Sequence, residues 1–269
     1  MTVASDKERR LQDIIKDLAK NKTAVVAFSG GVDSSLLLME TVKALGYERV
    51  IAVTASSPTS ILDELSEAEE FAATLGAGLV IVETQECNEP EFIRNGPRRC
   101  YHCKRIRYEA IRQLFGKDTD AVFFDGTQGD DDPLDRPGFA ALAELGIHTP
   151  LRDAGLTKKD VRLLLKKAGF DKLAVKTAQP CLATRIPQGA PITLDTLDRI
   201  RLGESLLKKL GFEQFRLRTH GTWARIVLDT EGFKKISSDQ RMRRLICKEF
   251  KKIGYEKVTL DLEEYGSGA

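Results

Sequence analysis

The sequence predicts an α/β protein in which a domain built on a parallel sheet is followed by a smaller α+β domain. Three observations predict this fold class. Short apolar segments alternate with helical ones over the first two thirds of the chain, as in a parallel sheet covered by helices on both faces. These apolar segments lack a polar/apolar alternation, which is typical of buried strands. After a loop rich in proline, the order changes to helix, two strands, helix and strand.

The elements of the first domain follow from periodicity and from the residues at their ends. Helices are predicted where apolar residues recur three and four positions apart, with a stop at Gly76 and a Thr157 cap. They lie at residues 5–20, 33–45, 60–75, 99–115 and 156–170. Strands are predicted at residues 23–28, 48–57, 78–84, 120–126 and, as a short fifth strand, 148–151.

The loop at residues 171–191 contains three prolines and marks the domain boundary. We therefore predict a first domain over residues 1–180 and a second over residues 181–269. In the second domain, the patterns predict helices at residues 193–210 and 238–253. Its strands are expected at residues 214–219, 223–228 and 256–262.

Composition excludes several classes of protein. The 269 residues are 42% hydrophobic and 30% charged, which excludes a disordered or fibrous chain. No segment approaches the roughly 20 consecutive apolar residues of a membrane helix, and the N-terminus has no signal-peptide core. Five cysteines are too few for a disulfide scaffold. We therefore expect a cytoplasmic protein without a membrane partner.

Charge is distributed unevenly along the chain although its net value is only +2. Residues 199–257 contain 16 Lys and Arg against 7 Asp and Glu, whereas the remainder contains 26 against 33. Such a region either meets anions, such as phosphates or nucleic acid, or forms a solvated helical face.

The segment Ser29-Gly30-Gly31-Val32-Asp33-Ser34-Ser35 joins the first strand to the next helix. Two glycines allow a sharp turn and a close approach to a ligand. The N–H groups at the start of the following helix favour a phosphate. The serine hydroxyls add donors, and the Asp33 carboxylate can hold magnesium. No Gly-Lys-Ser/Thr follows, so this segment is not a Walker A motif.

This segment resembles the S-G-G-x-D-S loop of the PP-loop family of ATP pyrophosphatases. The resemblance implies that ATP is cleaved between its α and β phosphates and that a carbonyl or carboxyl oxygen is adenylated. In a parallel sheet the ligand lies beyond the carboxyl ends of the strands. Thr54 and Ser56, which end the second strand, and Gly126, which ends the fourth, are therefore expected to line the nucleotide site.

Three of the cysteines form a pattern. Cys100 and Cys103 lie three residues apart in a helix, so both thiols can share one face. Cys181 lies in the loop between the domains. Three thiolates are one short of a closed zinc or cluster site, so a 4Fe-4S cluster held by them would leave one iron open. The alternative for the C-x-x-C pair is ordinary core packing. Cys87 and Cys247 fit no spacing.

The whole chain resembles the LarE family of sulfur transferases over roughly residues 5–265. The resemblance is carried by SGGVDSS, NGPRRCYHCK, the DG…DD…RPG loop, HTPL…TKKDVR, PCLATRIPQG and RLRTH…ARIVLD, in this order. It implies that ATP adenylates a carboxylate of a pyridinium-3,5-dicarboxylic acid mononucleotide and that sulfur then displaces AMP. The product is the precursor of the nickel-pincer cofactor of lactate racemase.

The resemblance also assigns residues and partners. Ser29, Gly30, Gly31, Asp33 and Ser34 match the pyrophosphate loop, and Ser35 follows them. Arg216 and Arg218 match an arginine pair near the substrate phosphate, although an amphipathic strand would also place arginines at alternate exposed positions. Glu204 matches an acidic residue near the site. The expected ligands are ATP, magnesium, the mononucleotide and sulfide or a sulfur donor, and the expected assembly is a homo-oligomer.

Two sources of sulfur occur in the family. Members with a single cysteine, matched here by Cys181, sacrifice its sulfur and keep dehydroalanine. Members with an added C-x-x-C pair are thought to hold a 4Fe-4S cluster on three cysteines, with an exchangeable sulfide on the fourth iron. With Cys100, Cys103 and Cys181, this sequence resembles the cluster type.

Two other functions remain open from the sequence. A PP-loop enzyme that thiolates tRNA would also use three cysteines, but nucleic acid is the less expected partner because no tRNA-binding module is recognisable. A nucleotide-sensing or structural zinc protein would carry zinc and release no pyrophosphate.

Overall fold

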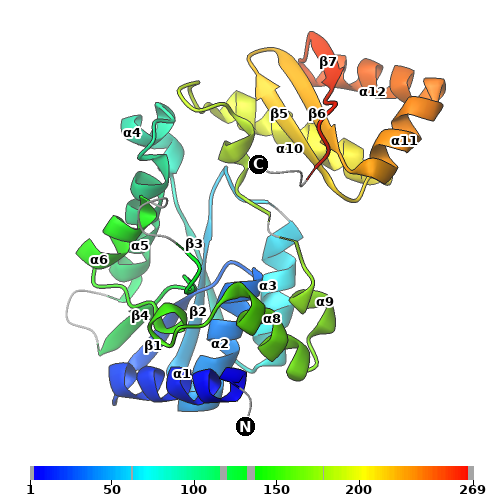
Figure 1. Cartoon of the computed structure of the whole chain (residues 1–269). Coiled ribbons are helices and arrows are strands. Elements are labelled where there is room, and N and C mark those ends of the chain that lie inside the picture. Colours follow the sequence, from blue (N-terminus) through cyan, green and yellow to red (C-terminus); the bar gives the residue numbers. More distant parts are fainter. Residues whose placement is uncertain (1–2, 62, 116–119, 132–136, 178, 266–269) are drawn as a thin grey trace. The chain divides into compact units, whose positions relative to one another are not determined.

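Four parallel strands form a sheet in the computed structural model, which describes residues 3–61, 63–115, 120–131, 137–177 and 179–265 (Figure 1). The strand order is β3-β2-β1-β4. The strands are β1 (Thr23–Ala27), β2 (Val50–Ser56), β3 (Gly78–Glu83) and β4 (Ala121–Phe124). The α/β prediction is confirmed.

The crossovers between these strands are helical, as expected for parallel pairing. The main helices are α1 (Val3–Ala19), α2 (Val32–Leu45), α3 (Asp63–Thr74), α5 (Arg99–Phe115) and α8 (Lys158–Lys167). Shorter helical segments are η1 (Tyr47–Arg49), η2 (Glu86–Asn88), α4 (Pro90–Ile93), α6 (Gly138–Glu144), α7 (Pro150–Asp153) and α9 (Asp171–Ala174).

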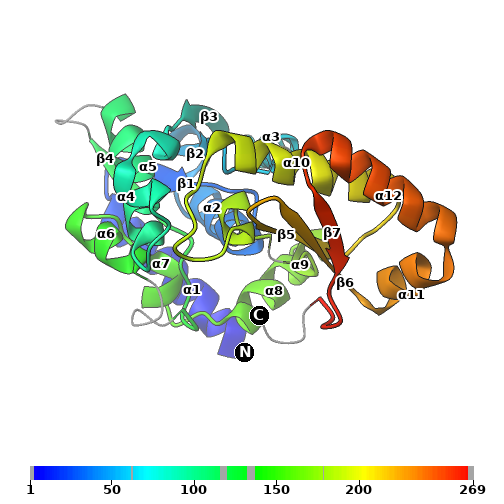
Figure 2. The same ribbon diagram turned by 90° about the horizontal axis from the view of Figure 1, so that it is seen from above.

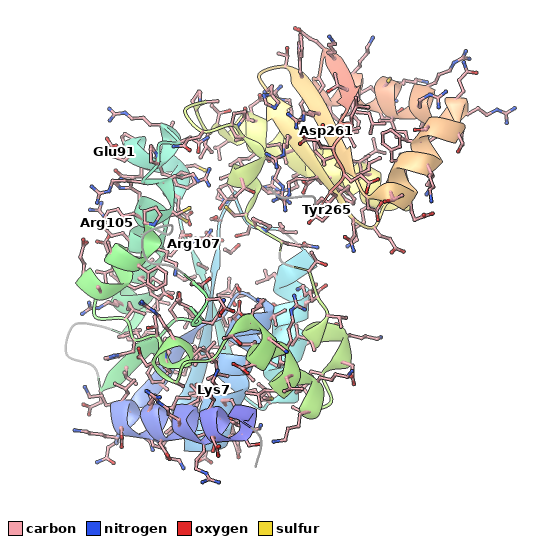
Figure 3. The ribbon with its side chains drawn as sticks, viewed as in Figure 1. Lys7, Glu91, Arg105, Arg107, Asp261 and Tyr265 are labelled. Carbon is pink, nitrogen blue, oxygen red and sulfur yellow. The ribbon has the colours of Figure 1, made fainter. Side chains whose placement is uncertain are left out.

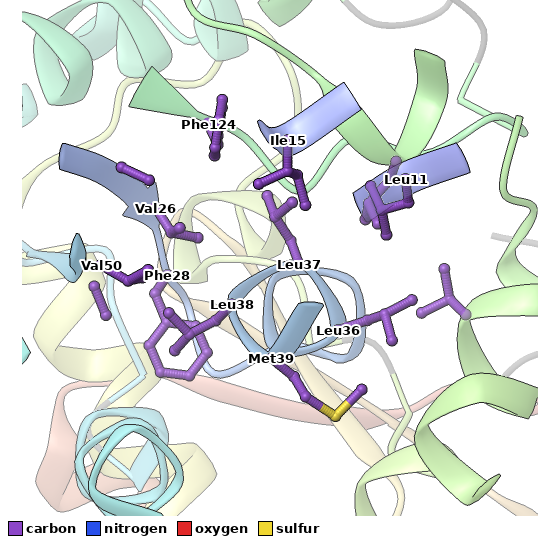
Figure 4. Packing of buried hydrophobic residues seen from close by; sticks show 14 of the residues in the cluster. Leu11, Ile15, Val26, Phe28, Leu36, Leu37, Leu38, Met39, Val50 and Phe124 are labelled. Carbon is purple, nitrogen blue, oxygen red and sulfur yellow. The ribbon is translucent and has the colours of Figure 1, made fainter. Parts of the chain in front are cut away.

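Both faces of the sheet are covered. On one face, Ala24, Val26 and Phe28 pack with Leu11 and Ile15 of α1 and with four consecutive residues of α2, from Leu36 to Met39 (Figure 4). On the other face, Val25 and Val53 pack with residues of α5 and α6. Alternate residues of β1 therefore point into two apolar layers, which explains why residues 24–27 of this strand are all apolar.

The expected fifth strand at residues 148–151 is wrong. His148 forms only an isolated parallel bridge with Phe124, and the chain then enters α7. Pro150 is the first residue of that helix, where its fixed φ and missing N–H are tolerated. Part of the DG…DD…RPG loop, residues 132–136, lies outside the described residues.

A three-stranded sheet, in the order β5-β6-β7, forms the C-terminal part. Strands β5 (Phe215–His220) and β6 (Trp223–Leu228) are antiparallel, and β7 (Lys257–Leu260) pairs with β6 in parallel. One face of this sheet packs on α10 (Leu194–Lys209), α11 (Thr230–Ser238) and α12 (Gln240–Ile253) (Figure 2). The predicted helix over residues 238–253 corresponds to α12, and α11 was not predicted.

The chain divides into two compact units. The first comprises residues 1–92 and 97–179, and the second comprises residues 93–96 and 180–269. The prediction assigned residues 93–96 to the first domain, over residues 1–180, whereas they belong to the second unit. There, Asn95 has a φ of +53° and is buried, and its side-chain amide donates to the carbonyls of Pro187 (2.8 Å) and Ala190 (3.0 Å).

Within the described residues, no helix is both long enough and apolar enough to cross a membrane.

Candidate functional site

The phosphate-binding loop predicted from the sequence lies between β1 and α2. Gly30 has a φ of +69°, a left-handed conformation that favours glycine. Gly31 precedes the first residue of α2, and no side chain caps the helix there. The first N–H groups of α2 therefore lack intrahelical acceptors and are available to an anion.

Serine hydroxyls hold the loop in shape. The Ser34 Oγ lies 3.2 Å from the Ser29 Oγ and donates to the Gly31 carbonyl at 3.1 Å. The same oxygen accepts from the Ser29 N–H at 3.3 Å. The Ser35 Oγ is buried and has no hydrogen-bond partner in the described part of the chain. The hydrogen bonds of Ser29 and Ser34 therefore close the turn.

The carboxyl ends of the neighbouring strands approach this loop. The Thr54 hydroxyl donates to the Phe28 carbonyl at 2.7 Å, next to Ser29. A Cβ placed on Gly126 would lie 2.9 Å from the Ser34 backbone nitrogen, so only glycine fits there. Ser56 ends β2, where its carbonyl accepts from Thr84 N at 2.8 Å. The first unit therefore brings Gly126 into direct contact with the loop, and Thr54 into contact with Phe28, the residue before it.

Two lysines that sequence reasoning missed bind the loop. The Lys158 ammonium lies 2.7 Å from Asp33 Oδ2, and Asp33 Oδ1 is buried without a hydrogen-bond partner among the described residues. The Lys176 ammonium donates to the Gly30 carbonyl at 3.2 Å and to Glu67 at 2.6 Å. Both cations contact a loop that has no Walker lysine, and each is paired with a carboxylate, Lys158 with Asp33 and Lys176 with Glu67.

Helix α5 carries the C-x-x-C pair and is bonded to the segment that follows β4. Cys100 is exposed and Cys103 is half-buried. The adjacent Lys104 lies 3.0 Å from Asp125, the residue before Gly126. Burial raises the pKa of Asp125, but Lys104 and the hydroxyls of Thr127 and Tyr108 outweigh it and lower that pKa overall. Asp125 is therefore an ionised anchor for α5.

A buried ion pair also joins α5 to the segments that follow β2 and β3. Glu86 is fully buried and pairs with Arg107, whose guanidinium also donates to Ser57 (3.2 Å) and Thr59 (3.1 Å). Arg107 is labelled in Figure 3. The Cys103 Sγ lies 3.8 Å from the same carboxylate. The C-x-x-C helix is thus bonded to segments that follow two of the strands near the loop.

Cys87 belongs to a different environment from the C-x-x-C pair. Burial and the neighbouring Glu86 carboxylate raise the pKa of its thiol to about 11. The thiol is therefore protonated at neutral pH and is a poor metal ligand or nucleophile.

Cys181 lies in the second unit, just before the short helix η3 (Leu182–Arg185). Its side chain is half-buried. Its carbonyl accepts from the Thr184 N–H at 3.0 Å and from the Thr184 hydroxyl at 2.8 Å. The backbone of Cys181 is therefore fixed by the turn that follows it.

Arg216 and Arg218 lie on β5, on the face opposite to the helices, because the intervening Leu217 belongs to the apolar cluster. The Arg216 guanidinium lies 5.2 Å from the ring centroid of Tyr265. The Nε atoms of both arginines are buried and have no hydrogen-bond partner in the described ranges. Arg225, opposite Arg218, is paired with Asp261, which is labelled in Figure 3. This face therefore offers two guanidinium groups to an anion.

The donor set can be tested for a metal cluster. Three thiols, of which two lie one helical turn apart, suit an iron–sulfur cluster better than a hard cation. Among the residues that the structure describes, no three His, Cys, Asp or Glu side chains form a group that could hold a single metal ion. Asp33 fits magnesium chemically, since one of its carboxylate oxygens is buried and unpartnered.

Comparisons with known proteins agree with these features. The family described as NAD synthase matches residues 3–91. The chain is 34% identical over 261 residues to an uncharacterised protein of Synechocystis sp. (97% of this chain, 96% of the relative). It is 29% identical over 261 residues to an uncharacterised protein of Methanocaldococcus jannaschii (96% of each).

A third relative has a named activity. It is the pyridinium-3,5-bisthiocarboxylic acid mononucleotide synthase of Lactiplantibacillus plantarum, 31% identical over 270 residues (100% of this chain, 95% of the relative). The aligned region covers the whole chain and therefore includes both units. The chain therefore belongs to the LarE family of ATP-dependent sulfur transferases, within the PP-loop superfamily.

Proposed function

We propose that this enzyme adenylates a carboxylate of pyridinium-3,5-dicarboxylic acid mononucleotide and replaces oxygen by sulfur. The product would be the thiocarboxylate precursor of the nickel-pincer cofactor of lactate racemase. One observation carries the proposal: an S-G-G-V-D-S loop at the carboxyl end of a parallel sheet, in a chain similar along its length to the Lactiplantibacillus synthase.

The reaction can be written with this chain's residues in defined roles. A substrate carboxylate oxygen attacks the α-phosphorus of ATP, and the bond to the bridging oxygen breaks. Pyrophosphate leaves toward the N–H groups of the loop, with Asp33 holding magnesium and Lys158 and Lys176 supplying positive charge. A sulfur nucleophile then attacks the acyl carbon, and AMP leaves with the carboxylate oxygen. Arg216 and Arg218 hold the substrate phosphate.

For the sulfur, we propose that Cys100, Cys103 and Cys181 bind a 4Fe-4S cluster. When bound, this group would supply an exchangeable sulfide on its fourth iron. The spacing supports the set, because Cys100 and Cys103 lie one helical turn apart in α5 and both thiols can share one face. The source of sulfide, a homo-oligomeric assembly and a cytoplasmic location are further expectations.

The products of ATP test the proposed reaction. Full-length protein is incubated with ATP, magnesium, the dicarboxylate mononucleotide and sulfide, without oxygen. We expect AMP and pyrophosphate, together with a mononucleotide heavier by the mass difference between sulfur and oxygen. Production of ADP and phosphate would contradict the assignment.

The mass of Cys181 tests the source of sulfur. We expect iron and sulfide in protein purified without oxygen, and an intact Cys181 after many turnovers. Cys100→Ser should lower the iron content, whereas the control Cys247→Ser, on the exposed side of α12, should not. Dehydroalanine at position 181 in iron-loaded protein would show that the protein sacrifices its own sulfur.

One observation favours a second candidate, tRNA thiolation. Helix α12 exposes Arg241, Arg244, Lys248 and Lys251 at successive positions three or four residues apart, so these four cations share one helical face. Such a line of charge suits a phosphate backbone. Retention of tRNA that weakens steeply with salt, and its thiolation in the presence of ATP, would support this candidate over the mononucleotide.

A further inference from the structure

A buried ion pair lies beside Cys181 in the second unit. The Arg185 side chain is only 5% exposed. The Arg185 Nε donates to Glu204 Oε1 at 2.9 Å, and the Arg185 Nη2 donates to Glu204 Oε2 at 3.2 Å. Both carboxylate oxygens of Glu204 are therefore bound in a two-pronged, planar contact, which fixes the orientation of both groups.

The Nη1 atom of Arg185 binds residues 180–184, the segment that contains Cys181. It donates to the Pro180 carbonyl, to the Cys181 carbonyl at 3.4 Å and to the Thr184 hydroxyl at 3.1 Å. The Thr184 hydroxyl in turn donates to the Cys181 carbonyl at 2.8 Å. One guanidinium thus connects the backbone on both sides of the Cys181 Cα to Glu204.

The other end of the ion pair contacts the arginine strand. Glu204 Oε1 also accepts the Leu217 N–H at 3.2 Å, and Leu217 lies between Arg216 and Arg218. The close approach of α10 to β5 makes this contact possible. A Cβ on Gly203 would lie 2.3 Å from the Leu217 side chain, so glycine at this position keeps the two elements together.

We propose that Arg185 and Glu204 are positioning residues that hold Cys181 and the Arg216–Arg218 strand in one fixed arrangement. The inference rests on the proposed function, in which Cys181 serves the sulfur and the two arginines bind the substrate phosphate. Glu204 acts here through Arg185 and the Leu217 N–H rather than as a free carboxylate. A buried ion pair is costly to desolvate and an apolar pair could fill the same space, so its value lies in fixing geometry.

Another ion pair of α10 is exposed and lies apart from Cys181, in contrast to Arg185–Glu204. Asp198 pairs with Arg201 on the same helix, and its side chain is 63% exposed. This pair has neither the burial nor the contacts of Glu204 with Cys181 and Leu217. Asp198→Asn is therefore a matched control, in which an ion pair of α10 is lost without any contact to the site.

The thiol reactivity of Cys181 tests the first half of the proposal. Full-length protein is freed of iron with a chelator, and alkylation of Cys181 by iodoacetamide is followed by mass spectrometry relative to the exposed Cys247. Arg185→Lys keeps the positive charge but loses the two-pronged contact. We expect it to raise the ratio of the Cys181 rate to the Cys247 rate by about five- to tenfold, because the loop opens more often.

Binding of nicotinamide mononucleotide, a pyridinium nucleotide with one phosphate, tests the second half. Arg185→Lys should change its affinity by less than about twofold, since Glu204 still accepts the Leu217 N–H. Glu204→Gln should raise the Cys181 alkylation ratio and also weaken binding by about fivefold or more. Asp198→Asn should change neither quantity.

Thermal unfolding of each variant separates positioning from a merely structural role. If Arg185→Lys does not fold, Thr184→Val removes the hydroxyl that joins Arg185 to the Cys181 carbonyl, and about a threefold rise in the ratio is expected. A folded Arg185→Lys or Thr184→Val with an unchanged ratio would overturn the proposal. Failure of the wild-type protein to bind the mononucleotide would count against the proposed function, whereas the alkylation result stands independently of it.

Discussion

The Asp33 carboxylate and the Lys158 ammonium, 125 residues apart in sequence, form an ion pair of 2.7 Å at the start of α2. The second oxygen of Asp33 is buried and accepts no hydrogen bond from the described residues. Lys158 therefore neutralises the one acidic group of the phosphate-binding loop. Magnesium bound by Asp33 would take over this neutralisation and free the Lys158 ammonium to bind a phosphate oxygen.

Substitution of Asp33 or Lys158 should impair the reaction with ATP, whereas substitution of Lys159 should not. Asp33→Ala should abolish pyrophosphate release without unfolding the protein, because the side chain is 28% exposed and is not part of the core. Lys158→Ala should raise the KM for ATP by about tenfold or more, through loss of a charge-assisted contact. Lys159→Ala, at the exposed neighbouring position, is the control. Unchanged pyrophosphate release by Asp33→Ala would exclude its role.

Gly126 should tolerate no side chain. A Cβ there would lie 2.9 Å from the Ser34 nitrogen and 3.0 Å from its Cα, so Gly126→Ala must push β4 and the loop apart. We expect a loss of about 1–3 kcal/mol in the free energy of unfolding and ATP binding weakened by about tenfold or more. Gly78→Ala, where a Cβ meets nothing within 4 Å, serves as the control. Equal ATP affinity in both variants, measured calorimetrically, would argue against contact between Gly126 and the loop.

Arg216 and Arg225 lie on the same face of the second sheet, and their substitutions should affect mononucleotide binding differently. Arg216→Ala should cost about 2–3 kcal/mol of mononucleotide binding, as expected for a hydrogen bond to a charged group, or about 30- to 150-fold in affinity. Arg225 is already paired with Asp261, so Arg225→Ala should weaken binding by less than about threefold. Wild-type affinity of Arg216→Ala in a calorimetric titration would remove Arg216 from the phosphate site.

Local patterns in the sequence were sufficient for the main elements. The prediction of a helix over residues 99–115 matches α5, because the apolar spacing and the polar flanks are both local. Helix α11 escaped prediction because Gly232 interrupts its first turn, whereas in the structure the Asp229 side chain caps that turn through the Gly232 N–H at 2.8 Å. The 148–151 strand failed because an apolar segment next to Pro150 suits a helix start as well as a strand.

Contacts that join distant segments were beyond the sequence. The loop motif identified Ser29 to Ser35 because strand, turn and helix are contiguous, but Lys158 and Lys176 reach it from more than 120 residues away. Likewise, the placement of Asn95 in the second unit depends on hydrogen bonds to residues 186–190. No local periodicity encodes such pairings, although the capping pattern at Thr157 did identify the start of the helix that carries Lys158.

Asp160 should make part of the stability depend on pH. Its Oδ2 accepts from Lys7 of α1 at 2.6 Å, from the Thr157 N–H at 3.0 Å and from the Thr157 hydroxyl at 2.8 Å (Figure 3 labels Lys7). Burial opposes ionisation, but these hydrogen bonds outweigh it and lower the pKa of Asp160 from 3.8 to about 2. A carboxyl group whose pKa is lower in the folded than in the unfolded state stabilises the fold above its unfolded pKa. This contribution is lost as the pH falls from about 4 through 2.

Asp160→Asn should therefore lower the free energy of unfolding at pH 7 by about 1–2 kcal/mol. Urea titrations should show the difference from wild type shrinking below pH 4. Asp153→Asn, at an exposed position in α7, should follow the wild-type curve. A difference between Asp160→Asn and wild type that stays constant down to pH 2 would mean that Asp160 contributes only a pH-independent cap.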